Sequence, residues 1–306
     1  MDLVDPAFGP LRTEAHAPAG QRMRAALQTF IQHAAHGVLT VLPIPGYTAE
    51  TRRGPGHFHM GAELFLQMQG HTDFWLPHAQ QRLEPLQALV MPPKLLHDEH
   101  VQDGRDAEFA NIVIYADSQM MTCHLAFQDS PGRPGILHLE QCRHVEAARI
   151  QGWLADAAIP PASDEVALWA VQQRALVLTV LVAVRRLLDA PASAESREPA
   201  LLAKLRVLVQ NRLGDPELTV ASLAMSLGCT PDYLSHLYSR ETGDHLRGMI
   251  QSQRLSRAAR LLAEGDAAVK EVAWCCGFGS ASYFIRSFRQ QFGMTPHSYR
   301  MAVKVA

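Results

Sequence analysis

The pattern of apolar and polar residues divides the chain into a region of short runs and a region of helical repeats. Residues 21–35 carry apolar side chains at helical spacing, which predicts an amphipathic helix. From residue 38 to about residue 120, short apolar runs are separated by Pro, Gly and Asp turns, which predicts a small β-barrel or sandwich. The predicted strands are Val38–Leu42, Leu64–Met68, Thr72–Leu76, Ala88–Met91 and Ala110–Tyr115.

A helical connector is predicted to follow, over residues 144–188, after a loop at Pro131–Pro134. Its first helix runs from His144 to Ala158, and its second begins near Ser163 and ends near Leu188. The second helix is apolar over a wide surface, so it must be buried. Packing on the barrel would satisfy this, and we favour packing that also forms a homodimer interface. Residues 1–190 are therefore one predicted domain, and the polar, Ala/Ser/Pro-rich residues 191–199 are a linker.

Residues 200–306 contain an internal repeat. Val220, Leu223, Ala224 and Gly228 recur 49 positions later as Val269, Val272, Ala273 and Gly277. After one additional turn residue, Tyr233, Leu234, Tyr238 and Gly243 recur 50 positions later as Tyr283, Phe284, Phe288 and Gly293. A repeat with its apolar positions in register predicts two copies of one supersecondary unit.

Each copy has the plan of a DNA-binding helix-turn-helix. In the second copy, Gly277 can adopt the left-handed conformation that ends a helix, and Ser280 can cap the next one. That next helix has Arg286 and Arg289 on its outer face. One helix, from Asp244 to Ala263, joins the copies and would hold them at a fixed separation. Both outer helices could then enter successive major-groove segments about 34 Å apart.

Charge and cysteine content agree with a DNA-binding part attached to another domain. The chain has 13 basic and 8 acidic residues from Pro199 onward, against 15 and 22 before it. Five cysteines without zinc-site spacing predict reduced thiols in the cytoplasm. We expect no secretion signal at the start and no membrane span, because the apolar run Ala175–Val184 is too short.

Residues 218–300 resemble the AraC-type double helix-turn-helix domain. The matching residues are Thr230–Tyr238, Glu241–Gly243, Arg254, Ala258, Leu261–Leu262, Gly277–Phe278, Ser282–Phe284, Phe288 and Phe292–Arg300. The resemblance implies a transcription regulator, with double-stranded DNA, RNA polymerase and a small-molecule effector as partners. The N-terminal part resembles the usual sensor and dimerisation region more loosely.

The resemblance also implies which side chains touch DNA. The base-contacting positions would be Asp232, Ser235, His236, Ala281, Ser282, Ile285 and Arg286, and the phosphate-contacting positions Arg240, Arg247, Arg257 and Arg289. Arg286 is the strongest candidate, because guanidinium binds guanine O6 and N7 together. His236 stands where the family usually has Arg, so base readout there would be weaker or water-mediated. Asp232 would either accept from a cytosine amine or favour the helix dipole.

A second cluster of chemistry lies in the predicted barrel. His57, His59 and Glu63, followed by Gly70 and later His97, resemble the motifs of the cupin barrel. His57 and His59 are two apart, so on a strand both imidazoles would face the interior. The four residues could bind Zn, Mn, Fe or Ni, could line an effector pocket, or could be hydrogen-bonded core residues. We favour the effector pocket, and no metal is certain.

Together these patterns predict an α+β chain, with an N-terminal cupin-like β-barrel, a helical connector and a C-terminal all-α double helix-turn-helix. We expect a cytoplasmic sequence-specific transcription regulator, an activator rather than an enzyme, controlled by an effector in the barrel. The alternative is a metal-dependent cupin enzyme, or a metal sensor, fused to a DNA-binding domain. The sequence holds no phosphate loop or nucleophile elbow that would indicate other chemistry.

Overall fold

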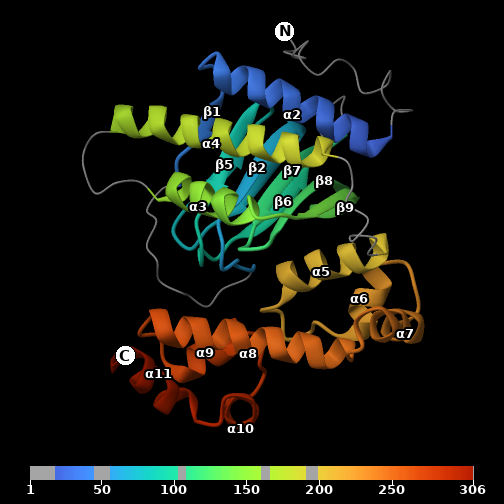
Figure 1. Ribbon diagram of the computed structural model, residues 1–306, viewed down its shortest axis with the longest axis vertical. Coiled ribbons are helices and arrows are strands. Elements are labelled where there is room, and N and C mark those ends of the chain that lie inside the picture. The colour runs from blue at the N-terminus through green and yellow to red at the C-terminus, as the bar shows by residue number, and fades with distance from the viewer. Residues whose placement is uncertain (1–17, 45–55, 103–107, 160–165, 191–198, 306) are drawn as a thin grey trace. The chain divides into compact units, whose positions relative to one another are not determined.

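The computed structural model describes residues 18–44, 56–102, 108–159, 166–190 and 199–305. The chain forms two compact units: residues 1–48 with 61–197, and residues 49–60 with 198–306. The predicted α+β class is confirmed, with strands in the first unit and helices in the second (Figure 1). Residues 191–198 of the predicted linker lie outside the described residues.

The first unit contains two β-sheets. The larger has the strand order β1-β5-β2-β7-β8-β9 and the smaller has the order β4-β3-β6. All neighbouring strands are antiparallel except β1 and β5. The strands are β1 Thr40–Leu42, β2 Glu63–Gln69, β3 His71–Trp75, β4 Gln80–Leu83, β5 Gln87–Met91, β6 Asp98–Gln102, β7 Ala110–Ala116, β8 Met120–Ser130 and β9 Arg133–Arg143.

Two of the sequence predictions for this unit are wrong. Among the described residues, the strands form two sheets, as the predicted sandwich would, and not the closed cupin-like barrel, because β1 and β9 end the larger sheet without pairing to each other. The β-region also extends beyond residue 120, since β8 and β9 continue it to Arg143. Pro131–Pro134 is consequently the turn of a long hairpin and the start of β9, and not a loop before a helix.

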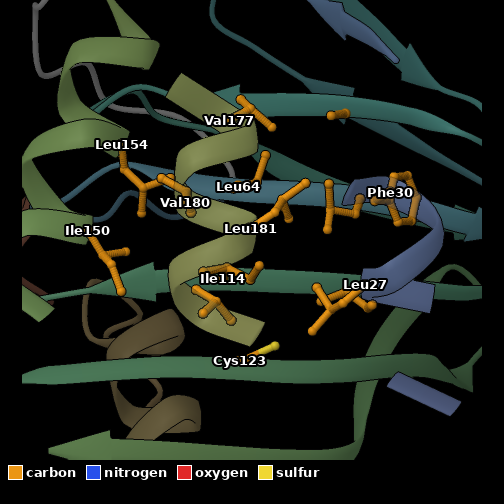
Figure 2. Close-up of a cluster of buried hydrophobic side chains, with 14 of the residues drawn as sticks. Leu27, Phe30, Leu64, Ile114, Cys123, Ile150, Leu154, Val177, Val180 and Leu181 are labelled. Carbon is orange, nitrogen blue, oxygen red and sulfur yellow. The ribbon is translucent and has the colours of Figure 1, made fainter. Parts of the chain in front are cut away.

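Alternate residues of the larger sheet build two separate cores. Leu64 and Ile114 face the helices α2 Ala19–Ala35, α3 Ala147–Ala158 and α4 Val166–Asp189 (Figure 2). Leu66 belongs to the same cluster. Phe65, between two of them in β2, instead packs with Phe74 of the smaller sheet. Successive side chains of a strand point to opposite faces, so this alternation gives one helix-facing core and one between the sheets.

Helix α4 is buried on one side only. Val177, Val180, Leu181 and Val184 are fully buried against the sheet, whereas Leu168 is 66% exposed. By length and composition α4 could also cross a membrane, although a core helix passes the same test. The run Ala175–Val184, on whose length the expectation of no membrane span rested, is only part of this helix, so length alone does not distinguish α4 from a membrane span.

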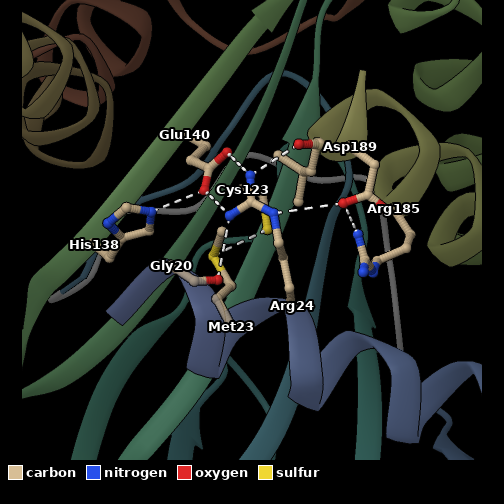
Figure 3. Close-up of polar contacts among 9 residues, drawn as sticks. Gly20, Met23, Arg24, Cys123, His138, Glu140, Arg185 and Asp189 are labelled. Carbon is tan, nitrogen blue, oxygen red and sulfur yellow. Dashed lines mark hydrogen bonds and ion pairs between the residues drawn. The ribbon is translucent and has the colours of Figure 1, made fainter. Parts of the chain in front are cut away.

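Arg24 of α2 ties three elements of the first unit together (Figure 3). Its guanidinium contacts the Glu140 carboxylate of β9 through both terminal nitrogens, with Nη2 2.6 Å from Oε2. Nη2 also donates to the carbonyl oxygen of Leu188 at 2.8 Å, and Nε lies 3.6 Å from Asp189 at the end of α4. His138 Nε2 lies 2.9 Å from the same Glu140. The ion pair with Arg24 and the hydrogen bond from His138 lower the pKa of Glu140 despite its partial burial.

The second unit is helical. Its helices are α5 Ala200–Arg212, α6 Val220–Ser226, α7 Pro231–Thr242, α8 Leu246–Glu264, α9 Val269–Cys275, α10 Ala281–Phe292 and α11 Pro296–Val305. These match the predicted order, including the single helix α8 between the two repeated pairs. One core forms around α5, α6 and α7, and an aromatic row of Phe278, Phe284, Phe288 and Tyr299 packs in the second pair.

Candidate nucleic-acid interface

The two outer helices, α7 and α10, begin and end in the same way. Thr230 accepts a hydrogen bond from the amide of Tyr233 at 3.3 Å, and Ser280 accepts one from the amide of Tyr283 at 3.4 Å. Both helices end at a glycine with φ +76°, Gly243 and Gly293. The repeat seen in the sequence is thus reproduced down to its caps, which are the local interactions that fix where a helix starts and stops.

The buried side of each helix explains which positions remain for DNA. In α7, Leu234, Leu237 and Tyr238 are buried, and in α10 Phe284, Ser287 and Phe288 are buried. Of the predicted base-contacting residues, Asp232, His236, Ser282, Ile285 and Arg286 are exposed, while Ser235 and Ala281 are half-buried. All seven therefore lie off the fully buried face, as a base-reading surface requires.

The four predicted phosphate contacts differ in their surroundings. Arg247 and Arg289 are exposed. Arg240 is also exposed, but its Nη2 lies 2.7 Å from the Glu241 carboxylate, with which a phosphate would have to compete. Cation side chains on the surface are available for phosphate binding, which supplies most non-specific affinity for DNA.

The prediction that Arg257 contacts phosphate is wrong. Arg257 is only 6% exposed, because its side chain lies on the buried side of α8. Its guanidinium is 4.7 Å from the centre of the Phe58 ring, and its Nη2 donates to the Gln210 carbonyl oxygen at 3.4 Å. Burial lowers the pKa of Arg257 to about 10, so it remains a cation at neutral pH. Its role is inside the second unit and not at a DNA surface.

Two further side chains on this surface were missed by the sequence reasoning. Tyr233 and Tyr283 occupy the same position in the first turn of α7 and α10, and they are 55% and 46% exposed. Tyr283 Oη donates to Gln251 Oε1 of α8 at 3.3 Å. Both tyrosines are matching positions of the internal repeat, and the sequence pattern groups them with the apolar positions. An amphipathic ring can equally lie at the surface with its hydroxyl hydrogen-bonded, as that of Tyr283 is.

Comparison with known proteins agrees with this geometry. A helix-turn-helix domain family matches residues 223–302. The chain is 35% identical over 127 residues to the HTH-type transcriptional regulator YijO of Escherichia coli, and 30% identical over 111 residues to the transcriptional activator NphR of a Rhodococcus species. The C-terminal third is an AraC-type DNA-binding domain. The predicted resemblance of residues 218–300 to this domain is therefore confirmed, whereas the cupin-like resemblance of the N-terminal part stays a prediction.

The similarity concerns the AraC-type domain and not the whole chain. The match to YijO covers 42% of this chain and 44% of that protein, and the match to NphR covers 36% and 33%. Among solved structures, the DNA-binding domain of AdpA in complex with a target DNA is 30% identical, with a TM-score of 0.33, over 34% of this chain and 93% of that chain. The chain spans less than half of the curated relatives named here.

The first unit, which precedes most of the AraC-type domain in the sequence, contains a buried cluster of polar side chains. Glu63 begins β2, His97 directly precedes β6, and Glu99 lies within β6. His97 Nε2 is 4.0 Å from Glu63 Oε2 and 3.9 Å from Glu99 Oε1. The structure therefore brings the predicted Glu63 and His97 together and adds Glu99, which the sequence reasoning missed. Its signal was the spacing of two from His97, which places both on one side of an extended chain.

Burial holds the members of this cluster in their neutral forms. It lowers the pKa of His97 to about 4 and raises the pKa of Glu99 to about 8. The pKa of Glu63 is raised by burial and by the nearby Glu99. His97 Nδ1 lies 2.9 Å from the Leu95 carbonyl oxygen, which requires Nδ1 to carry the proton and leaves Nε2 as the acceptor. A neutral imidazole fixed in this way has the form that metal-binding histidines take.

His57 and His59 belong to the second unit, on the segment 56–60. Their rings contact edge to face with centroids 4.8 Å apart. The expectation that they lie on a strand is wrong, since the described residues 56–60 hold no regular strand and β2 begins only at Glu63. Between them, Phe58 is 3% exposed and packs on Arg257 of α8.

Proposed function

We propose that the chain is a cytoplasmic, sequence-specific transcription regulator that reads two adjacent segments of double-stranded DNA. The observation that carries this proposal is the pair of matching outer helices, α7 and α10, with equivalent caps and exposed polar faces. Two such helices on one domain suit a bipartite site, because each fills one major-groove segment. The name of NphR, a transcriptional activator, favours activation. Contact with RNA polymerase is the partner interaction that we propose for it.

In vitro selection from a random DNA library tests this proposal. The full chain should enrich a motif made of two conserved boxes whose centres are about one helical turn apart. The variant for comparison carries Arg286→Ala and His236→Ala, which removes one exposed polar side chain from each outer helix. We expect this variant to enrich a motif in which each box has lost the preference at the base pair that the replaced side chain contacts, while it still binds DNA at low salt. Failure of the unaltered chain to enrich any motif would contradict the proposal.

We further propose that a small-molecule effector controls DNA binding. Two features support this. The cluster of Glu63, His97 and Glu99 places hydrogen-bonding groups in an otherwise apolar interior, which is typical of a ligand site. The segment with His57 and His59 groups with the DNA-binding helices, although its neighbours in the sequence belong to the first unit. A ligand bound by these histidines would act directly on Phe58 and the α8 helix beneath it.

A thermal-shift screen of metabolites and divalent metals with the full chain tests the effector proposal. A ligand at about a hundred times its dissociation constant should stabilise the chain by about 2.7 kcal/mol. The variant with His57→Ala and His97→Ala should lose that stabilisation.

The alternative function, a metal sensor or metal-dependent enzyme, rests on the fixed neutral form of His97. His57, His59, Glu63 and His97 would be the ligands, and a bound Zn, Mn, Fe or Ni would supply a positive centre for effector or substrate. Elemental analysis of the purified chain decides between the alternatives. Stoichiometric metal that is lost in the same double variant would favour the metal reading, and a metal-free chain that responds to an organic effector would favour the first.

We also propose a homodimer formed through α4. Leu168, Val171, Ala175, Leu178 and Val182 recur at the spacing of a coiled-coil seam. Leu168, Val171 and Val182 are exposed by 66%, 59% and 39%, on the side of the helix away from the sheet. A second copy of α4 would cover this apolar stripe, which water otherwise contacts at a cost in free energy.

A further inference from the structure

Both turns of the AraC-type domain contain a glycine in the left-handed conformation, but the two glycines have different neighbours. Gly228, in the first turn, has φ +66°, and a Cβ atom placed there would meet nothing within 4 Å. Gly277, in the second turn, has φ +76°, and a Cβ atom there would lie 2.6 Å from the Leu213 carbonyl oxygen. The second turn is therefore pressed against the connection between α5 and α6, while the first turn is open.

The close approach of the second turn to the α5–α6 connection is also evident at the glycine of that connection, Gly214. A Cβ atom on Gly214, in the α5–α6 connection, would lie 2.9 Å from the Cys275 carbonyl oxygen at the end of α9. Real Cβ atoms almost never come this close to a backbone oxygen, so each position admits only glycine without a shift of the chain. Glycine in such pairs is typical of close backbone contact.

Arg254 of α8 closes this contact. Its Nε donates to the Leu213 carbonyl oxygen at 3.0 Å, and its Nη2 donates to the Asp215 carbonyl oxygen at 2.6 Å. Leu213 caps the C-terminus of α5, where carbonyl groups have no partner inside the helix. Arg254 is partly buried, and Gly277 packs on it, since a Cβ atom there would also lie 2.8 Å from Arg254 Nε.

We propose that Leu213, Gly214, Asp215, Arg254 and Gly277 form a joint that fixes the orientation of α10 relative to α7. Helix α8 alone would connect the two helix-turn-helix pairs at one place and leave them free to swing as it bends. The joint adds a second connection, from the turn before α10 back to the connection before α6 and α7. Arg254 is therefore a positioning residue, and its effect on DNA binding would be on the spacing that the domain accepts. This last step rests on the proposed function.

The first test measures the joint without DNA. Nitroxide labels are introduced through a non-canonical amino acid at Arg240 and Arg289, which are exposed in α7 and α10. In the full chain, diluted with unlabelled chain, the pulsed electron resonance distance distribution should be narrow. Gly277→Ala should broaden or shift it, because the methyl group displaces backbone. Gly228→Ala is the matched control, with the same positive φ but open space, and should leave the distribution narrow.

The second test measures the consequence on DNA that the full chain has selected. Insertion of about five base pairs between the two boxes moves one box to the opposite face of the duplex. The unaltered chain should lose most of its affinity for this DNA. Arg254→Gln should weaken binding to the selected spacing by about tenfold and reduce the loss caused by the insertion. Arg260→Ala, on the exposed side of the same helix, is the control and should retain the spacing preference.

The outcomes separate the joint from the function on which it rests. A distance distribution with the same mean and the same width in Gly277→Ala as in the unaltered chain, with circular dichroism unchanged, overturns the joint. So does an unchanged spacing penalty in Arg254→Gln. If the unaltered chain selects no DNA, the proposed function fails, and the distance measurement alone then decides whether the joint exists.

Discussion

At the residue scale, the two outer helices differ most in one pair of side chains. Arg286 of α10 and His236 of α7 are both exposed, but only the guanidinium can donate twice to one guanine and is always charged. The second helix-turn-helix is therefore expected to carry more of the base readout than the first.

Replacement of Arg286 with alanine should cost about 1–3 kcal/mol of affinity for the selected DNA and relax the preference at one base pair. Replacement of Arg289 with alanine should instead weaken binding to all sequences about equally and lower its salt dependence. Competition binding against DNA with single-base changes measures both. Retention of full sequence preference by Arg286→Ala would exclude that side chain as a base reader.

The buried Glu99 predicts how stability depends on pH. Its pKa is raised to about 8 in the folded chain, against about 4.5 when unfolded, so between these values the folded state holds a proton that the unfolded state has released. Stability is full below the unfolded pKa and falls as pH rises toward 8. Glu99→Gln should reduce this decrease in the free energy of unfolding with pH. Each unit of difference between the folded and unfolded pKa corresponds to about 1.4 kcal/mol. Urea unfolding from pH 5 to pH 8 measures it, and an unchanged slope would contradict the burial argument.

The exposed positions of α7 and α10 could be predicted because helical periodicity and an internal repeat fix them together. Arg257 could not be assigned in the same way. Arg257 lies on helix α8 next to the buried residues Leu255, Ala258 and Ala259. The sequence pattern predicts that a charged residue at the edge of such a buried side is exposed. Only tertiary packing on Phe58 places it inside.

At the scale of elements, helices were easier to predict than strands. Strand β9 was missed because Pro134 and Gly135 resemble a loop, and because its residues are half-buried on both faces and so lack an alternating pattern. Strands β4 and β6 are polar at most positions, Gln-Gln-Arg-Leu and Asp-Glu-His-Val-Gln. Strand β4 pairs with β3 as a local hairpin, whereas the pairing of β6 with β3 is a long-range contact. Whether a set of strands closes into a barrel also depends on such contacts and not on local pattern.

The Arg24 cluster holds α2, β9 and the end of α4 together, and it predicts a stability effect. Arg24→Ala should lower the free energy of unfolding by about 1–3 kcal/mol, because Glu140 loses its charge-assisted hydrogen bonds while still partly buried. Gln28→Ala, exposed on the same helix, is the control and should change stability little. Chemical unfolding of both variants measures the difference. Equal stability of the two would show that the ion pair contributes nothing net.

At the scale of the whole molecule, the proposed α4 seam predicts the oligomeric state. Val171→Glu places a charge within the apolar stripe and should convert the dimer to a monomer, as measured by analytical ultracentrifugation. Gln172→Glu adds the same charge beside the stripe and should leave the dimer intact. A chain that is monomeric without any substitution would remove the seam as a dimer interface.

The division of the chain into two units does not follow the order of the sequence. Segment 56–60 continues directly into β2 of the first unit, yet it groups with the AraC-type domain. Sequence reasoning placed His57 and His59 in the barrel because the spacing resembled a strand motif. It could not show that Phe58, between them, is buried against α8.

The central claim is that α7 and α10 act together as one bipartite reader. Hydroxyl-radical footprinting of the full chain on its selected DNA tests this most directly. We predict two protected patches on one face of the duplex, with centres about ten base pairs apart, and loss of the sharp pattern at one patch in Arg286→Ala. A single protected patch, or two patches on opposite faces, would contradict the account.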